Sequence, residues 1–122
     1  MEQQVLLIED EPNIAEAIRY LLTRAGFGVR WLSNGDQALS DILSNRTDLV
    51  ILDLMLPGQS GLDVLKSVRA VAALAALPVI MLTAKGQARD REAAEHAGAS
   101  LFMAKPFSNA AFLVAVQDLV TR

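Results

Sequence analysis

Acidic side chains, one hydroxyl group and one lysine each follow an apolar segment of the chain, at the point where that segment ends. They are Glu9, Asp10 and Glu11 after residues 5–8, Asp53 after 49–52, Thr83 after 79–82, and Lys105 after 101–104. Carboxylates gathered at one place raise one another's pKa unless a positive charge lies among them, and Mg²⁺ suits such hard oxygen ligands. A carboxylate beside a metal ion and a lysine can act as a nucleophile toward phosphorus. Both cations would stabilise charge on the transferring group, so these residues indicate phosphoryl-transfer chemistry.

Each of these residues also has a plainer interpretation when it is taken alone. Asp10 could stabilise the N-terminus of a following helix, and Asp53 could be a turn residue before Pro57-Gly58. Thr83 could be an ordinary residue at a strand end, and Lys105 a solvated one. Agreement among four segments is harder to explain in this way, and it favours the functional interpretation.

The hydrophobic pattern predicts the elements that must position these residues. Apolar runs at 5–8, 49–52, 79–82 and 101–104 predict buried strands, and the alternation over 27–31 suits a strand at the edge of a sheet. Helices are predicted between the strands, the first with Pro12 in its first turn and the last with an N-cap at Ser108. Five strands separated by helices indicate a parallel sheet covered on both faces. Ligands of such sheets bind beyond the carboxyl ends of the strands, which places the candidate residues at one rim.

The composition favours one globular unit over residues 1–122. Hydrophobic residues make up 52% of the chain, which argues against disorder, and no linker or repeat is visible. Because the chain has no cysteine and no recognisable secretory signal, we expect no disulfide framework and a cytoplasmic location. The net charge is −3, basic residues are scattered, and no apolar run is long enough for a bilayer. We therefore expect no contact of this segment with nucleic acid or membrane.

Four ordered motifs give the chain a resemblance to a known family. The motifs are VLLIEDEP at 5–12, DLMLPGQSG at 53–61, VIMLTAK at 79–85, and KPF at 105–107. Together they resemble the receiver domains of bacterial two-component response regulators over nearly the whole chain. The resemblance implies a flavodoxin-like α/β fold with a five-stranded parallel sheet in the order 2-1-3-4-5. It also implies a phosphorylation-activated signalling switch rather than an enzyme, apart from catalysis of its own phosphorylation and slow self-dephosphorylation.

The resemblance assigns a role to each matching residue around the acceptor. Asp53 corresponds to the residue that takes a phosphoryl group from a phosphohistidine of a sensor kinase or histidine phosphotransfer protein. Glu9 and Asp10 correspond to the acidic pair that holds Mg²⁺, with Asp10 the more direct ligand. The backbone carbonyl of Met55 would also face the metal, and the Met55 side chain would help to set the phosphoryl lifetime.

Further residues follow in the second half of the chain. Thr83 would form a hydrogen bond with the phosphoryl group, and Lys105 would pair with it. Lys85 lies at a second lifetime-tuning position, and Pro106 would follow a cis peptide bond. Phe102 occupies the aromatic switch position. We expect it to turn inward on phosphorylation and so to change the face formed by the fourth helix, fifth strand and fifth helix.

The sequence departs from the family pattern at a few positions. The first acid is Glu9, where Asp is also frequent, which changes reach rather than chemistry. Residues 98–102 lack the acidic residues often found before the fifth strand, which argues against a dimer built from salt bridges on that face. A phosphorylation-dependent homodimer stays open. Phe102 replaces the more frequent Tyr and has no hydroxyl group to donate a hydrogen bond.

Three other classes of protein compete with this interpretation. Phosphohydrolases with an aspartate nucleophile usually carry a second Asp two residues on, where this chain has Met55. Flavin-binding modules of similar topology need a hydroxyl- or glycine-rich phosphate loop after the first strand, whereas the acids at 9–11 would repel a phosphate. A receiver-like interaction domain that no longer takes phosphate would not be expected to retain the complete set of site residues, which is Asp10, Asp53, Thr83 and Lys105. The kinase partner and the output are not specified by the sequence.

Three further interpretations concern packing and exposure. The predicted helix at 87–97 offers only alanines as apolar residues, so it can bury little surface and should be among the less firmly anchored elements. Trp31 is interpreted as a strand-packing residue, and His96, on a polar helix, as a solvated side chain.

Overall fold

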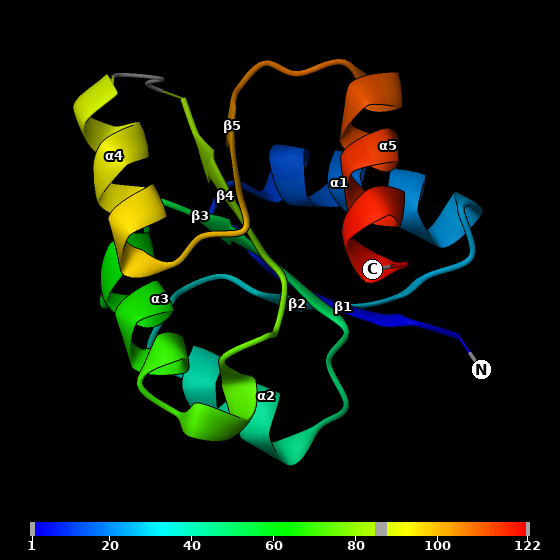
Figure 1. Cartoon of the computed structure of the whole chain (residues 1–122). Helices are drawn as coiled ribbons and strands as arrows, with labels where there is room; N and C mark the ends of the chain where they lie inside the picture. Colours follow the sequence, from blue (N-terminus) through cyan, green and yellow to red (C-terminus); the bar gives the residue numbers. More distant parts are fainter. Residues whose placement is uncertain (1, 85–87, 122) are drawn as a thin grey trace.

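The computed structural model describes residues 2–84 and 88–121, which form a five-stranded parallel sheet between two layers of helices (Figure 1). The strands are β1 (Gln4–Ile8), β2 (Gly28–Leu32), β3 (Leu49–Asp53), β4 (Val79–Thr83) and β5 (Leu101–Ala104). Their spatial order is β2-β1-β3-β4-β5. The predicted fold class and strand order are thus confirmed. The edge strand β2 lies one residue later than the predicted 27–31, because Phe27 packs into the core just before the strand begins.

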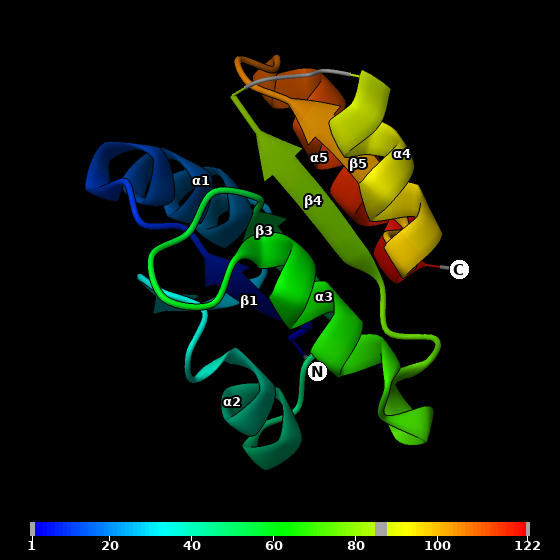
Figure 2. The same ribbon diagram turned by 90° about the vertical axis from the view of Figure 1, so that its left-hand side faces the viewer.

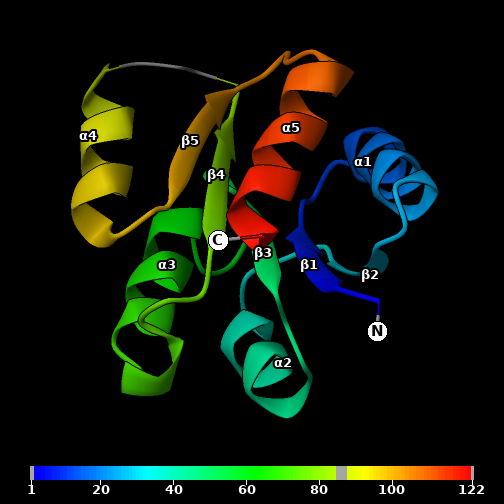
Figure 3. The same cartoon turned by 45° about the vertical axis from the view of Figure 1, so that its right-hand side comes forward.

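Helices cover both faces of the sheet, as the views in Figures 2 and 3 show. They are α1 (Pro12–Arg24), α2 (Ala38–Ser44), α3 (Gly61–Arg69), α4 (Ala88–Ala97) and α5 (Asn109–Val120), with a short 3₁₀ helix, η1 (Ala72–Leu74). Helices α1 and α5 pack on one face, and α2, α3 and α4 on the other. None of the described helices is long and apolar enough to span a lipid bilayer.

The central strands are apolar on both faces because both faces are covered. Along β1, Val5 and Leu7 contribute to the core under α1 and α5, whereas Leu6 and Ile8 contribute to the core under α2, α3 and α4. Every residue of β3 and β4 is buried. The two strands that end at Asp53 and Thr83 therefore lie wholly within the core.

Local sequence signals fix where the helices begin. Ser60 caps α3 by accepting a hydrogen bond from the backbone N–H of Asp63, and Ser108 caps α5 in the same way through Ala111, as predicted. In α4 only Ala94 is buried. The expectation that this helix buries little surface is therefore confirmed.

Candidate functional site

The predicted site residues meet at the carboxyl edge of the sheet. Asp53 is the last residue of β3 and Thr83 the last residue of β4. Glu9 directly follows β1, and Lys105 directly follows β5. Because all the strands are parallel, these four positions share one rim.

Three carboxylates form the centre of the site. Glu9, Asp10 and Asp53 each offer a carboxylate oxygen, and these oxygens all lie within 4.8 Å of one another. Glu9 is fully buried and Asp53 is 5% exposed, whereas Asp10 is open to solvent. The group is therefore anchored in the protein on one side and accessible on the other.

Lys105 joins the two buried carboxylates. Its Nζ lies 2.7 Å from Oε1 of Glu9 and 3.3 Å from Oδ2 of Asp53. The backbone N–H of Lys105 donates to the carbonyl oxygen of Thr83 at 2.7 Å, which continues the β4–β5 ladder into the site. Strand pairing thus sets the position from which the ammonium group reaches the acids.

Burial and charge act together on the ionisation of this group. Burial raises the pKa of Glu9, and the neighbouring Asp53 adds to this, although the hydrogen bond from Lys105 acts in the opposite direction. Burial alone would lower the pKa of Lys105, but the hydrogen bond to Glu9 and the charges of Glu9 and Asp53 raise it above its usual value. Lys105 therefore carries its positive charge at neutral pH.

The loop after β3 is shaped around Asp53. The backbone N–H of Met55 donates to Oδ1 of Asp53 at 3.2 Å, so one acceptor oxygen is oriented by its own loop. The loop returns to the sheet at Gly61, where a Cβ atom would collide with the carbonyl oxygen of Asp53. Between these two points, the N–H of Gln59 donates to Oδ1 of Asp36 at 3.0 Å. These contacts hold the loop at its start, within it and at its end.

The other predicted residues lie around this centre in different environments. Thr83 is buried at the end of β4, and the Lys105–Pro106 peptide bond is cis. The Met55 side chain is 68% exposed, so it points into solvent beside the acids rather than into the core. Lys85 lies outside the described residues.

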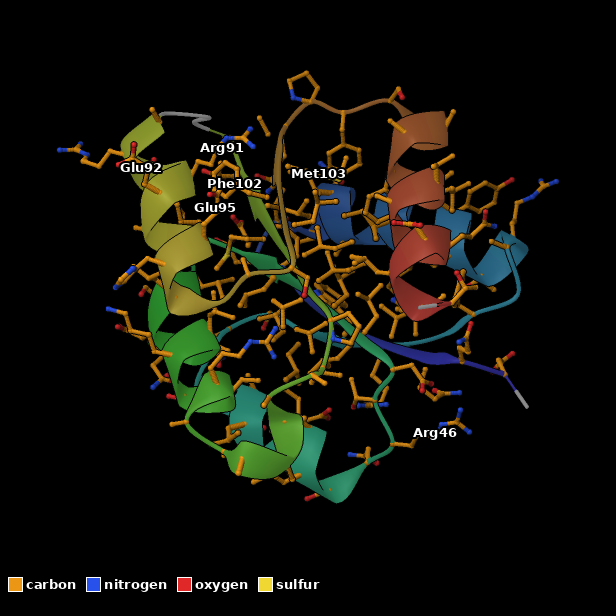
Figure 4. The ribbon with its side chains drawn as sticks, viewed as in Figure 1. Arg46, Arg91, Glu92, Glu95, Phe102 and Met103 are labelled. Carbon is orange, nitrogen blue, oxygen red and sulfur yellow. The ribbon has the colours of Figure 1, made fainter. Side chains whose placement is uncertain are left out.

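Phe102 differs from the expectation of an outward ring that turns inward. It is only 5% exposed and belongs to the core beneath α4, with Ala94 among its neighbours. The guanidinium carbon of Arg91 lies 5.1 Å from the centre of the Phe102 ring (Figure 4). A phenyl ring has no hydroxyl group that must keep contact with water, so its burial carries no polar cost. A signal from Thr83 would have to shift a ring that is already packed.

Sequence reasoning missed one contact of the acidic loop. The indole Nε1–H of Trp31 donates to the backbone carbonyl of Glu9 at 2.8 Å. The alternating pattern of β2 places Trp31 on a strand but gives no sign of this bond. Only the register of β2 against β1 brings the indole to the loop.

The donor set fits Mg²⁺. This cation prefers carboxylate and carbonyl oxygens in octahedral geometry, with bond lengths of about 2.0–2.1 Å. Oxygens from Glu9, Asp10 and Asp53 are close enough together to share one ion, and within residues 2–84 and 88–121 the ion pairs of this group come from Lys105, which contacts Glu9 and Asp53. The excess negative charge favours a bound cation.

Comparison with known proteins agrees with this geometry. The family model described as response regulator receiver domain matches residues 5–117. The DNA-binding response regulator MtrA of Mycolicibacterium smegmatis is 39% identical over 107 residues, which cover 88% of this chain and 46% of MtrA. The transcriptional regulatory protein DltR of Streptococcus agalactiae is 45% identical over 104 residues, which cover 85% of this chain and 46% of DltR. The chain thus spans about half the length of these relatives.

Solved structures give the same result over the full length of the chain. A putative response regulator from Chloroflexus aurantiacus superimposes with a TM-score of 0.95 at 34% identity, with 100% of both chains covered. The receiver domain of a sensor histidine kinase from Pseudomonas aeruginosa, which has a magnesium ion coordinated in its active-site cleft, gives a TM-score of 0.92 at 30% identity, also with 100% of both chains covered. The fold and the acidic rim are those of a phosphorylatable signalling domain. The chain belongs to the response regulator receiver domain family.

Proposed function

We propose that Asp53 is the phospho-acceptor of this receiver domain and that Glu9, Asp10 and the backbone carbonyl of Met55 support the Mg²⁺ that the reaction needs. The observation that carries the proposal is the position of Asp53, whose oxygens are close both to the other two carboxylates and to the ammonium group of Lys105. A lone strand-end aspartate would have neither neighbour.

The proposed reaction is a direct phosphoryl transfer. A carboxylate oxygen of Asp53 attacks the phosphorus of a phosphohistidine on a sensor kinase or phosphotransfer protein. A new P–O bond forms, the P–N bond breaks, and the imidazole leaves with the bonding electrons and takes up a proton. Mg²⁺, when bound, would neutralise part of the phosphoryl charge.

Residues of the chain orient and stabilise the product. The Met55 N–H holds one Asp53 oxygen, so the carboxylate enters the reaction already oriented. Lys105 pairs with the phosphoryl oxygens, and the Thr83 hydroxyl forms a hydrogen bond with them. Movement of Thr83 toward the phosphoryl group then alters the packing of Phe102 and the face formed by α4, β5 and α5.

The partners and setting follow from the same proposal. The phosphoryl donor is a histidine kinase or histidine phosphotransfer protein, and residues 1–122 act as one receiver unit in the cytoplasm. Two curated relatives are, by their names, a DNA-binding response regulator and a transcriptional regulatory protein. We propose a regulatory output of that general kind, reached through an output domain or partner and open to a phosphorylation-dependent homodimer.

Phosphorylation by a small donor tests the acceptor assignment. Acetyl phosphate with Mg²⁺ should add one phosphoryl group to the chain, as measured by intact-protein mass spectrometry. Asp53→Asn should abolish the addition, because an amide oxygen is a poor nucleophile. Asp63→Asn, in the exposed first turn of α3, is the matched control and should leave it unchanged. Undiminished modification of Asp53→Asn would show that the acceptor is another residue.

A further inference from the structure

Trp31 reaches from the edge strand β2 to the acidic loop. It is the only tryptophan of the chain, and its ring packs partly against the core under α1. Its indole N–H nevertheless ends on the carbonyl oxygen of Glu9 at 2.8 Å. This is a short bond in good range for an N–H donor. A side chain whose sole role was to fill the core would not need an N–H donor directed at the acidic loop.

The bond acts on the peptide group that carries Asp10. The Glu9 carbonyl belongs to the planar peptide unit linking Glu9 to Asp10, so fixing its oxygen fixes the plane from which Asp10 departs. The N–H of Glu9 donates to the carbonyl of Leu32 at 3.1 Å. The backbone polar groups of Glu9 are thus bound by two consecutive residues of β2.

The Glu9 side chain is fixed independently. Lys105 holds Oε1 at 2.7 Å, and the Glu11 N–H donates to Oε2 at 3.2 Å. Asp10, in contrast, is exposed, and its direction depends on the backbone that precedes it. Trp31 therefore acts on the peptide group from which the exposed Asp10 side chain departs.

A second contact links the indole to helix α1, which follows the loop. The guanidinium carbon of Arg19 lies 5.9 Å from the centre of the Trp31 ring, within the range of a cation–π contact. The ring is thus contacted by the helix on the far side of the acidic loop. This contact restrains the ring while its N–H holds the loop.

From these contacts we infer that Trp31 is a positioning residue for the metal site, which holds the Glu9–Asp10 peptide group in the orientation that brings Asp10 toward Asp53. The inference rests on the proposed Mg²⁺-dependent function. It assigns the edge strand β2 a role in metal binding through Trp31, which the residue types at the rim do not indicate.

Magnesium titration of three proteins tests the inference. Trp31→Phe keeps an aromatic ring but loses the donor, and it should weaken Mg²⁺ binding about three- to ten-fold, the effect of one lost hydrogen bond. Val29→Ala is the matched control, because Val29 lies on the same side of β2, packs against the same core and pairs with Val5, at the other end of β1 from the acidic loop. It should lower thermal stability and leave Mg²⁺ affinity unchanged. Affinity is read from the backbone amide NMR signal of Asp10.

A spectroscopic measurement on the unmodified chain needs no variant. The single indole N–H signal should shift as Mg²⁺ is added, with the same midpoint as the Asp10 amide. An indole signal that does not move, equal affinity of Trp31→Phe and the unmodified chain, or an equal loss of affinity in Val29→Ala would each overturn the inference. Failure of the unmodified chain to bind Mg²⁺ is a different result, and it would overturn the proposed function itself.

Discussion

Lys105 lies where its positive charge can affect both metal binding and phosphoryl transfer at the rim. Its ammonium group contacts Glu9 and Asp53, two of the three carboxylates expected to surround the metal. Positive charge at this point opposes a second cation in the ground state, and it favours the phosphoryl group once that group has arrived. The same side chain should therefore have opposite effects on metal binding and on phosphorylation.

Lys105→Met separates these two effects. Loss of the positive charge should strengthen Mg²⁺ binding about ten-fold, because less positive charge opposes the ion. Phosphorylation by acetyl phosphate should slow, because the transferring group loses its cationic partner. Mg²⁺ titration and a phosphorylation time course check the two parts. Lys66→Met, on the exposed side of α3, should change neither. A variant with weaker Mg²⁺ binding would contradict this account of Lys105.

Met55 provides a prediction about the lifetime of the phosphoryl group. Its side chain is 68% exposed beside Asp53 and has no group suited to orienting an attacking water molecule. Met55→Asn should speed the loss of the phosphoryl group about two- to ten-fold, the effect of one hydrogen bond to that water. The decay is followed after removal of the donor. Equal decay rates in the two proteins would argue against a role for this position.

At the scale of elements, the β3–α3 connection shows how backbone geometry supports the acceptor. Gly61 begins α3 directly against the backbone of Asp53 and Leu54, where no flexible side chain could move to make room for a Cβ atom. The glycine thus allows α3 to begin beside the strand that carries the acceptor. Substitution of Gly61 therefore tests whether the geometry of the loop affects phosphorylation of Asp53.

Gly61→Ala should destabilise the fold by about 1–3 kcal/mol and also slow phosphorylation, because the backbone of Asp53 must shift. Ser60→Ala is the neighbouring control. It removes only the N-cap of α3, at a cost of about 1 kcal/mol, and should leave the phosphorylation rate unchanged. Chemical denaturation and the acetyl phosphate reaction measure the two quantities. Equal phosphorylation rates in both variants would show that the backbone geometry at Gly61 does not affect phosphorylation.

The elements were predictable from the sequence because buried strands and amphipathic helices carry their periodicity locally. The composition of the rim was also predictable, because parallel strands end at one edge of a sheet and their order in the sequence places Asp53, Thr83 and Lys105 at that edge. Contacts that depend on register or on side-chain reach were not predictable. The bond from Trp31 to Glu9 depends on how β2 pairs with β1, and the burial of Phe102 depends on how closely α4 packs.

In the whole molecule, the α-helix with the fewest buried residues among those described is α4, which follows the strand that ends at Thr83. Helix α4 buries only Ala94, whereas α5 buries Phe112, Val116 and Leu119. A helix with little buried surface opens more readily, so its packing can be biased by a small change at Thr83. This contrast makes the α4 side of the molecule the natural route for a signal.

Hydrogen exchange tests that route. Without a ligand, amides of α4 should exchange faster than those of α5. With beryllofluoride and Mg²⁺ as a phosphoryl mimic, changes in exchange should concentrate between Thr83 and Phe107. The comparison with α5 in the same sample is an internal control. Changes confined to the acidic rim, or centred on α1, would contradict a signal that passes through α4 and β5.

We propose that Asp53, and no other carboxylate of the rim, takes the phosphoryl group. The most direct measurement is borohydride reduction of the chain after reaction with acetyl phosphate and Mg²⁺, because borohydride converts an acyl phosphate to an alcohol and so turns the acceptor aspartate into homoserine. Peptide mass spectrometry then locates the change. We predict homoserine at position 53, and only when Mg²⁺ is present during phosphorylation. Reduction at Asp10 or Glu9, or unchanged labelling when Mg²⁺ is removed by a chelator, would contradict the account.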